Sequence, residues 1–154
     1  MVENMSPKPQ RGVRSNYHYF TDISTRWHDN DIYGHINNVT YYSYFDSVAN
    51  HYLIHKGKLD IHNGSCIGLV VSSGCQYHAA LAYPDLLEGG LRVNRLGNSS
   101  VEYGVAVFRK GEAEACAEGF FTHVFVEREN RRPIPIPAPL RAALEAIQSS
   151  ADLK

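Results

Sequence analysis

The residues best suited to chemistry in this chain lie together between positions 26 and 39. The stretch reads RWHDNDIYGHINNV, which places two carboxylates, two imidazoles, a glycine and a pair of asparagines side by side. Carboxylates and imidazoles transfer protons in many enzymes, and a carboxylate can also act as a nucleophile. Aspartate and asparagine equally favour turns and helix caps, so a purely structural role is the alternative. The density of these groups around His35 favours a functional site.

The hydrophobic pattern changes across this stretch from that of a strand to that of a helix. Before it, the apolar residues share one parity: Tyr17, Tyr19, Ile23 and Trp27. After it, they recur at steps of three and four: Tyr41, Tyr42, Phe45, Val48, Ala49, Tyr52 and Leu53. A change of period from about 2 to about 3.6 predicts a strand over residues 15–27 and a helix over residues 38–56. The polar cluster therefore lies on the loop that leads into a helix.

The start of this helix adds backbone groups to the candidate site. Its first N–H groups have no acceptor within the helix, and the helix dipole is positive there. Both features stabilise negative charge that develops on an oxygen atom. Asn37 or Asn38 suits the N-cap position, and Gly57 suits the C′ position that follows the last turn.

The composition restricts the class of protein. The chain has 154 residues, of which 15 are basic and 16 acidic, and its formal net charge is −1. This balance argues against nucleic acid or a membrane as the partner, and no apolar run approaches the ~20 residues of a membrane span. With no apolar signal segment, we expect a cytoplasmic protein. Three isolated cysteines indicate buried thiols in a reducing compartment: Cys66, Cys75 and Cys116.

The rest of the chain is predominantly strand. Residues 1–13 are expected to form a disordered leader, and residues 14–150 a single domain. After a polar connection over residues 57–66, alternating apolar residues predict four strands: from 67 to before Pro84, then 86–96, 101–109 and 113–128. Short turns make the last three an antiparallel meander. The proline-rich segment 133–139 predicts an extended arm, and a short helix follows it with Leu140, Leu144 and Ile147 on one side.

Together these elements predict an α+β fold with one long helix and an antiparallel sheet of about five strands. A single helix covers only one face of such a sheet and leaves its other face or an edge uncovered. We therefore expect the chain to pair with itself as a homo-oligomer.

The loop and the helix after it resemble a known signature. The pattern D-x-D-x-x-G-H-I-N-N-x-x-Y over residues 29–41, followed by Y-F-D at 44–46, resembles hotdog-fold acyl-CoA thioesterases of the 4-hydroxybenzoyl-CoA thioesterase-like group. The segment LGNSSV at 96–101 resembles a turn between two sheet strands of that group, and RRPIPIP at 131–137 resembles its C-terminal ending. The resemblance implies a hotdog fold, in which an antiparallel sheet wraps around one long central helix. This agrees with the order of elements derived above.

The resemblance also implies roles for individual residues. Asp31, the second aspartate of the pair, is the expected catalytic carboxylate. The thioester carbonyl is expected to contact backbone N–H groups at the helix entrance: Asn37, Asn38 and Val39. Similar acyl-carrier-protein thioesterases use a histidine four residues after the aspartate, which matches His35, but Tyr33 stands where those enzymes carry an asparagine. Gly34 and Tyr41 are further expected substrate-binding positions.

The implied reaction needs few groups. Thioester hydrolysis requires an activated water or a nucleophile, together with donors for a developing oxyanion. Thiolate is a good leaving group, so one carboxylate and a helix N-terminus suffice. No metal or cofactor is expected, and coenzyme A enters only as part of the substrate. Whether Asp31 is the base or the nucleophile stays open, as do the acyl group, the thiol carrier (coenzyme A or a carrier protein) and the choice between homodimer and homotetramer.

Two alternative functions keep the same fold. Hotdog enoyl-CoA hydratases carry a histidine five residues after an aspartate with Asn-Pro between, but Gly34 occupies that position relative to Asp29 and the chain has no Asn-Pro. A non-catalytic acyl-CoA-binding regulator would lack the carboxylate at the helix entrance or carry a DNA-binding segment. Asp31 is present, and residues 1–16 are too short for such a segment.

Several other polar residues have both a structural and a functional interpretation. His51 and His55 are spaced to grip a metal, but no third ligand is evident, so we favour a surface role. Asp29 is expected to shape the loop. Five further residues could belong to the site, but packing, solvent exposure or turn formation would equally explain each of them: His28, Tyr44, His78, Ser99 and Ser100. Coenzyme A phosphates would need basic residues, which are more frequent in the second half of the chain.

Overall fold

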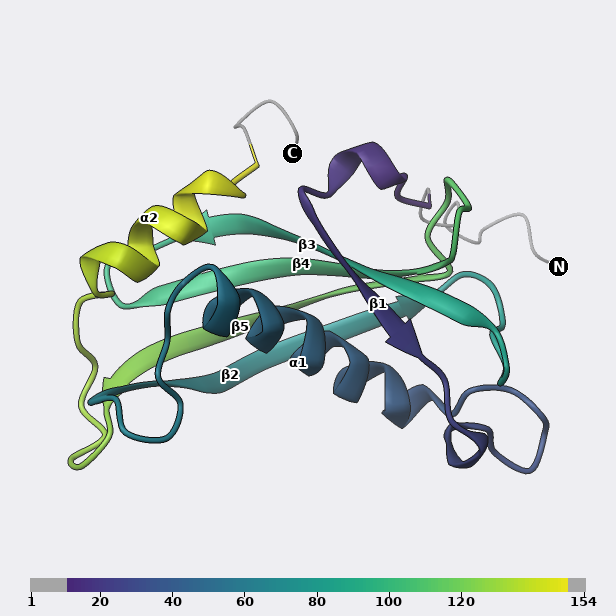
Figure 1. Cartoon of the computed structure of the whole chain (residues 1–154), viewed down its shortest axis with the longest axis horizontal. Helices are drawn as coiled ribbons and strands as arrows, with labels where there is room; N and C mark the ends of the chain where they lie inside the picture. Colours follow the sequence, from purple (N-terminus) through teal and green to yellow (C-terminus); the bar gives the residue numbers. More distant parts are fainter. Residues whose placement is uncertain (1–10, 150–154) are drawn as a thin grey trace, which may run out of the picture.

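The computed structural model describes residues 11–149 and shows one antiparallel sheet with one long helix against it (Figure 1). The long helix is α1, Asn38–His55, and the short helix α2, Ala138–Ala146, lies at one end of the sheet. The strands follow in the spatial order β1-β3-β4-β5-β2. Their bounds are β1 Tyr19–Ser24, β2 Cys66–Tyr77, β3 Leu86–Leu96, β4 Ser100–Arg109 and β5 Ala117–Glu127. The predicted helix, α+β class and meander are confirmed.

Helix α1 packs closely on the sheet because glycines lie beneath it. A Cβ atom at Gly89 of β3 would lie 2.2 Å from the Val48 side chain, and one at Gly119 of β5 would lie 2.7 Å from the Phe45 ring. The apolar positions of the helix that the sequence pattern selected are buried, with the exception of the partly exposed Tyr42. Each fully buried aliphatic or aromatic side chain contributes roughly 1.5–3 kcal/mol. The helix is therefore held as a rigid support for the loop that precedes it.

The two ends of α1 are capped as the sequence predicted, although the glycine acts for a different reason. Asn37 is the N-cap, and its side chain accepts a hydrogen bond from the Val39 N–H at 3.0 Å. Gly57 follows the last turn and donates its N–H to the Tyr52 carbonyl. The positive φ falls instead on Lys58, at 58°. Gly57 is required by space, because a Cβ atom there would lie 2.5 Å from a Leu140 methyl group.

The N-terminal part of the domain departs from the prediction. The strand expected over residues 15–27 is shortened to β1, and short 3₁₀ turns flank it at Arg14–Asn16 and Trp27–Asp29. The last residues of the expected leader are ordered, because Gly12 donates its N–H to the Glu118 carboxylate and Val13 forms a β-bridge with Glu114. Residues 1–10 of that leader lie outside the described residues.

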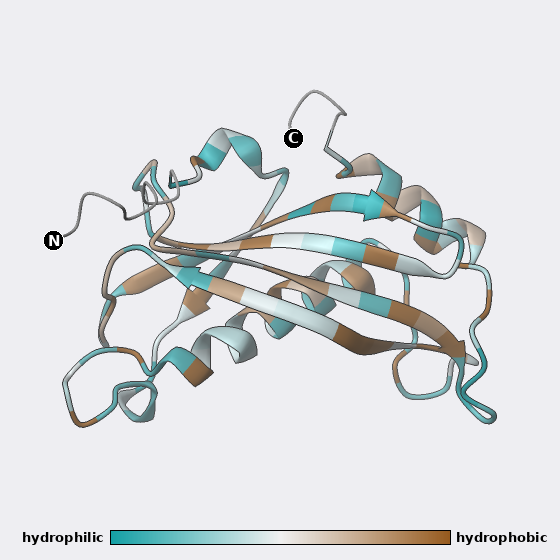
Figure 2. Cartoon of the chain, turned by 180° about the vertical axis from the view of Figure 1, so that it is seen from behind, coloured by the Kyte–Doolittle hydropathy of each residue, from teal (hydrophilic) through white to brown (hydrophobic). Residues whose placement is uncertain are grey.

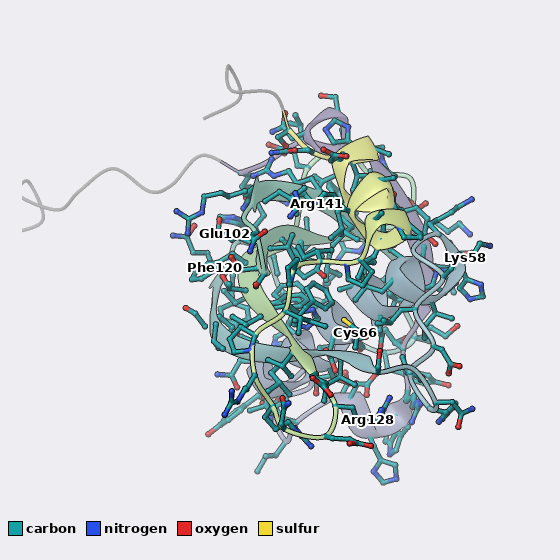
Figure 3. The ribbon with its side chains drawn as sticks, turned by 90° about the vertical axis from the view of Figure 1, so that its left-hand side faces the viewer. Lys58, Cys66, Glu102, Phe120, Arg128 and Arg141 are labelled. Carbon is teal, nitrogen blue, oxygen red and sulfur yellow. The ribbon has the colours of Figure 1, made fainter. Side chains whose placement is uncertain are left out.

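The two faces of the sheet differ. Seen from behind, the sheet lies in front of α1 and its strands carry hydrophobic bands (Figure 2). In the end-on view, Cys66 lies on the helix side of the sheet and Phe120 on the opposite side (Figure 3).

Helix α2 is attached to the turn between β3 and β4, where Arg141 donates to the Gly97 carbonyl at 2.6 Å. Within residues 11–149, no helix is long and apolar enough to cross a membrane.

Among residues 11–149, the edge strand β2 pairs with one strand, β5. Its middle carries exposed apolar side chains, with Val71 61% exposed and Val70 53% exposed. The hydrogen-bond register shifts between Val70 and Ser72, which interrupts the ladder at this point. This is the uncovered edge that the sequence analysis expected.

Candidate active site

The polar loop between β1 and α1 is a tight, internally bonded turn around Asp31. The Asp31 N–H donates to the His35 carbonyl at 2.9 Å, and the Asp31 carbonyl accepts the Gly34 N–H at 3.0 Å. The Asp31 Oδ1 atom accepts the Tyr33 N–H at 2.9 Å. Gly34 has a φ of +85°, and a Cβ atom there would meet nothing within 4 Å, so the backbone conformation alone favours glycine. The turn fixes the position of the Asp31 carboxylate.

A second set of hydrogen bonds fixes the loop to the segment that follows β2. The Ile36 N–H donates to the Leu81 carbonyl at 2.8 Å. The Asn30 side chain accepts the Tyr83 N–H at 2.9 Å. The segment 81–83 is thus bonded directly to the loop.

Asp29 has a structural role, as the sequence analysis expected. Its Oδ2 atom accepts the Arg26 N–H at 2.8 Å and the Tyr44 hydroxyl at 2.6 Å. Burial and the Asp29 carboxylate together raise the pKa of Tyr44 well above its usual value, so the hydroxyl keeps its proton. Asp29 therefore joins the loop to α1. The Tyr44 side chain is buried, and it does not line the cavity beside the loop that is described next.

The loop, the start of α1 and the end of β2 enclose a cavity of about 370 Å³, here called the loop cavity. Four of the predicted site residues line it: Asp31, His35, Asn38 and Tyr41. Gly34, Asn37 and Val39 lie outside its lining. The rest of its wall comes from Ile36, from the last residue of β2, Tyr77, and from the three residues that follow it: His78, Ala79 and Ala80. The structure therefore brings together the predicted carboxylate, histidine and helix entrance.

Of the three backbone N–H groups predicted to bind the oxyanion, two already donate hydrogen bonds within the chain. The Asn37 N–H donates to the Asp29 carbonyl at 2.9 Å, and the Val39 N–H is occupied by the Asn37 side chain. The Asn38 N–H has no acceptor among residues 11–149. Likewise, no donor from the described part of the chain reaches the second Asp31 carboxylate oxygen, Oδ2. One donor and one acceptor of this cavity thus stay available to a ligand.

Two tyrosines form the aromatic wall of the loop cavity. The rings of Tyr41 and Tyr77 meet edge to face, with centroids 5.1 Å apart. The Tyr77 hydroxyl donates to the Asn38 carbonyl at 3.2 Å, which ties β2 to the first turn of α1. Burial raises the pKa of Tyr41 to about 12, so its hydroxyl is uncharged at neutral pH. These residues supply an apolar, neutral surface beside the Asp31 carboxylate.

Sequence reasoning undervalued the wall that follows β2. For His78 the sequence left packing or solvent exposure as the alternative to a place in the site, and it gave no reason to place Tyr77 there. The available signal was their position just before the turn at Pro84, because strand ends are where loops converge on sites.

Other weighed residues lie elsewhere. Ser99 lies in the turn between β3 and β4, and Ser100 begins β4; their carbonyls accept the N–H groups of Phe125 and Gly97, respectively. His28 is exposed and does not line the loop cavity. The His51 and His55 rings lie 4.3 Å apart on α1, and His51 also contacts the Tyr19 hydroxyl. Across residues 11–149 no three His, Cys, Asp or Glu side chains are grouped as metal ligands.

A larger cavity, of about 480 Å³, lies along the uncovered edge of the sheet. It runs between α1 and β2, and Tyr42, Asp46, Val70 and Phe121 are among its lining residues. None of the predicted site residues lines it. Its size alone does not make it the reactive centre, because the free carboxylate oxygen and the free N–H lie at the loop cavity.

Comparison with known proteins identifies the class. The long helix wrapped by an antiparallel sheet is the hotdog fold, and the chain is a thioester hydrolase of this fold. More specifically, it belongs to the Thioesterase-like superfamily, whose sequence profile matches residues 25–144. The matched range includes the Asp31 loop, α1 and the whole wall after β2.

Individual proteins resemble the chain in sequence or in structure. The crystal structure of the PA5185 protein from Pseudomonas aeruginosa strain PAO1 is 61% identical, with a TM-score of 0.91 over 92% of this chain and 99% of that chain. The 1,4-dihydroxy-2-naphthoyl-CoA thioesterase Slr0204 from Synechocystis is 16% identical, with a TM-score of 0.74 over 82% of this chain and 94% of that chain, and shares the fold. The protein YsmA of Bacillus subtilis is 26% identical over 126 residues, which is 82% of this chain and 84% of YsmA.

Proposed function

We propose that the protein hydrolyses thioesters of coenzyme A to the free acid and coenzyme A at the loop cavity. One observation carries the proposal. A carboxylate with a free oxygen, Asp31, lines the same cavity as a helix-entrance residue with a free N–H, Asn38. These are the two groups that acyl transfer from a thiol requires.

The chemistry follows from the positions of these groups. The thioester carbonyl accepts a hydrogen bond from the Asn38 N–H, whose helix dipole favours the developing oxyanion. Asp31 then either takes a proton from an attacking water or attacks the carbonyl carbon itself. The C–S bond breaks, and the electron pair leaves with the thiolate. His35, an exposed residue at the mouth of the cavity, assists by orienting the thioester or the water.

Arg109 is our candidate for the coenzyme A end of the substrate. Its guanidinium donates to the Ala80 carbonyl at 3.2 Å, and Ala80 lines the loop cavity. The guanidinium also lies 3.4 Å from Glu112 and 3.6 Å from Asp85, so its charge is already balanced by two carboxylates. A phosphate of the substrate would compete with these carboxylates.

We also propose that the working form is a homo-oligomer, either a homodimer or a homotetramer, with the site near a subunit interface. Large apolar side chains beside the loop cavity are exposed in the single chain. Ile32 is 93% exposed and Tyr33 is 84% exposed, and both adjoin Asp31. Val70 and Val71 on the β2 edge are likewise exposed. Burial of such a surface against a second copy of the chain removes it from water.

The first experiment measures thiol release from a panel of acyl- and aroyl-CoA substrates. Wild-type protein is compared with Asp31→Asn and with Asp22→Asn, a control that neutralises an exposed aspartate on β1. We expect turnover of at least one substrate, loss of it in Asp31→Asn, and wild-type rates in Asp22→Asn. A panel without turnover would contradict the coenzyme A proposal, and full activity of Asp31→Asn would contradict the assigned carboxylate.

Light scattering after gel filtration tests the oligomer. Wild-type protein is expected at two or four times the chain mass. The variant Ile32→Asp should shift to lower mass, whereas Ile54→Asp, which charges an apolar residue exposed on α1, should not. A monomeric wild-type protein would overturn the proposal.

A further inference from the structure

His78 occupies a position in the loop cavity for which the proposed reaction has so far no use. It directly follows β2, and its backbone N–H donates to the Cys116 carbonyl at 2.8 Å. Its side chain is 8% exposed and lines the loop cavity together with Asp31 and His35. It is therefore a nearly buried imidazole whose main chain is fixed by β-type hydrogen bonding.

A carboxylate holds the ring of His78 from the other side. The His78 Nε2 atom lies 2.9 Å from Oε2 of Glu118, on β5. Glu118 is itself fixed by two further donors, the Gly12 N–H at 2.8 Å and the Tyr17 hydroxyl at 3.0 Å. Burial and Glu118 raise the pKa of Tyr17 well above its usual value, so this hydroxyl stays a donor. Three donors thus converge on one carboxylate, and that carboxylate orients the imidazole.

This arrangement selects the tautomer of neutral His78. A carboxylate accepts hydrogen bonds, so Nε2 carries the proton and Nδ1 keeps its lone pair. Within residues 11–149 no donor is bonded to Nδ1, and the side chain lines the loop cavity. Nδ1 is therefore the ring nitrogen that is left available to a ligand.

We propose that His78, oriented by Glu118, is the base that activates water in the second half of the thioester hydrolysis. The inference rests on the proposed function and assigns to Asp31 the role of nucleophile. An Asp31 oxygen bonds to the acyl carbon, the C–S bond breaks, and the thiolate leaves with the electron pair. Water then attacks the acyl carbon of the resulting anhydride and gives its proton to His78 Nδ1. The bond between the acyl carbon and the Asp31 oxygen breaks, and the proton passes from His78 to solvent or thiolate.

The division of work between the two residues follows from their surroundings. Asp31 has a free Oδ2 atom at the turn, beside the helix entrance that binds the carbonyl. An anhydride formed there no longer has a free carboxylate to activate water, so a second base is needed. His78 is the histidine in the cavity wall that has a carboxylate partner; His35 makes no side-chain hydrogen bond within the described chain. A carboxylate partner fixes the tautomer and stabilises the imidazolium that forms.

The test compares His78→Gln with wild type, because glutamine can still donate to Glu118. We expect kcat to fall by about 10²–10⁴-fold. The first equivalent of thiol should still be released rapidly, as a burst of one thiol per site, with acyl-Asp31 detectable by mass spectrometry of quenched protein. His62→Gln, at an exposed histidine outside the cavity, should behave as wild type.

A small-molecule experiment excludes a merely structural role. In His78→Ala, free imidazole should restore a measurable part of kcat, whereas it should not restore Asp31→Asn. Glu118→Gln should lower kcat less than His78→Gln does. Wild-type kcat in His78→Gln, slow thiol release without a burst, or no rescue by imidazole would overturn the assignment of His78. Asp31→Asn would remain inactive in each of these cases, so the proposed function is tested separately.

Discussion

The loop cavity and the interior between α1 and the sheet treat polar side chains in opposite ways. In the interior, polar groups are bonded to one another: the Tyr44 hydroxyl donates to Asp29, and the Tyr103 hydroxyl lies 3.2 Å from Nδ1 of the buried His123. In the loop cavity, Asp31 keeps a free oxygen and Asn38 keeps a free N–H. The residue types are similar in both regions. What differs is whether hydrogen-bonding capacity is left over for a ligand.

The two aspartates of the loop show this difference at the smallest separation. Asp29 and Asp31 are two residues apart, yet Asp29 accepts the Tyr44 hydroxyl of α1 and lies outside the lining of the loop cavity, whereas Asp31 bonds only within its own turn and lines the cavity. A carboxylate that joins structural elements stabilises the fold, whereas one that lines the cavity can contact a ligand. The following predictions test this contrast from the largest expected effect to the smallest.

Asp31→Asn is expected to lower kcat/KM by about 10³-fold or more, because the amide can neither attack nor accept a proton effectively. The Tyr33 N–H keeps an acceptor, so the melting temperature should stay close to that of wild type. Steady-state thiol release and thermal unfolding measure the two quantities. Loss of activity together with a large fall in melting temperature would mean that Asp31 belongs with Asp29 as a structural carboxylate.

His123 should make the fold sensitive to acid. Burial lowers its pKa to about 4, whereas a histidine in the unfolded chain titrates near ~6.5. Between these values the unfolded state binds more protons, so stability is complete above about pH 6.5 and is lost as the pH falls to about 4. The expected loss is about 3 kcal/mol of unfolding free energy. Urea unfolding of wild type and His123→Gln at pH 7 and pH 4 measures it; equal pH dependence in both proteins would contradict this account.

Tyr44→Phe is expected to lower the unfolding free energy by about 1–3 kcal/mol, because the Asp29 oxygen loses its hydroxyl donor. The cavity wall is untouched, so kcat/KM should change by less than about tenfold. Tyr42→Phe serves as the control, since Tyr42 is partly exposed on the same helix. A variant with full stability and no activity would place the Asp29–Tyr44 pair in the reaction.

Asn37→Ala is expected to cost about 1 kcal/mol through loss of the N-cap, and Asn37→Gly only a few tenths. Urea unfolding distinguishes the two variants. Because the substitution frees the Val39 N–H and leaves the Asn38 N–H unchanged, kcat/KM should fall by less than about tenfold. A loss as large as that of Asp31→Asn would show that the Asn37 side chain itself contacts the substrate.

Local features of the sequence predicted much of the fold. Helix α1 was found within one residue of its predicted end because a long 3.6-residue pattern with an asparagine cap is a strong signal. The strand Leu86–Leu96 also matched, since turns bound it on both sides. The strand predicted over 15–27 was too long, because the alternation of Tyr17 and Trp27 continues into 3₁₀ turns whose backbone has no strand partner.

The sequence by itself determined which segments are helical or extended and that the polar loop opens a helix, because these properties depend on neighbours a few residues apart. Only the tertiary structure decided which polar groups of the loop are left free. The Asp29 carboxylate is taken by Tyr44 on α1, and the wall at His78 comes from a strand paired with β5. These contacts join residues distant in the chain. Their geometry follows from how α1 and the strand ends pack together, which no local pattern encodes.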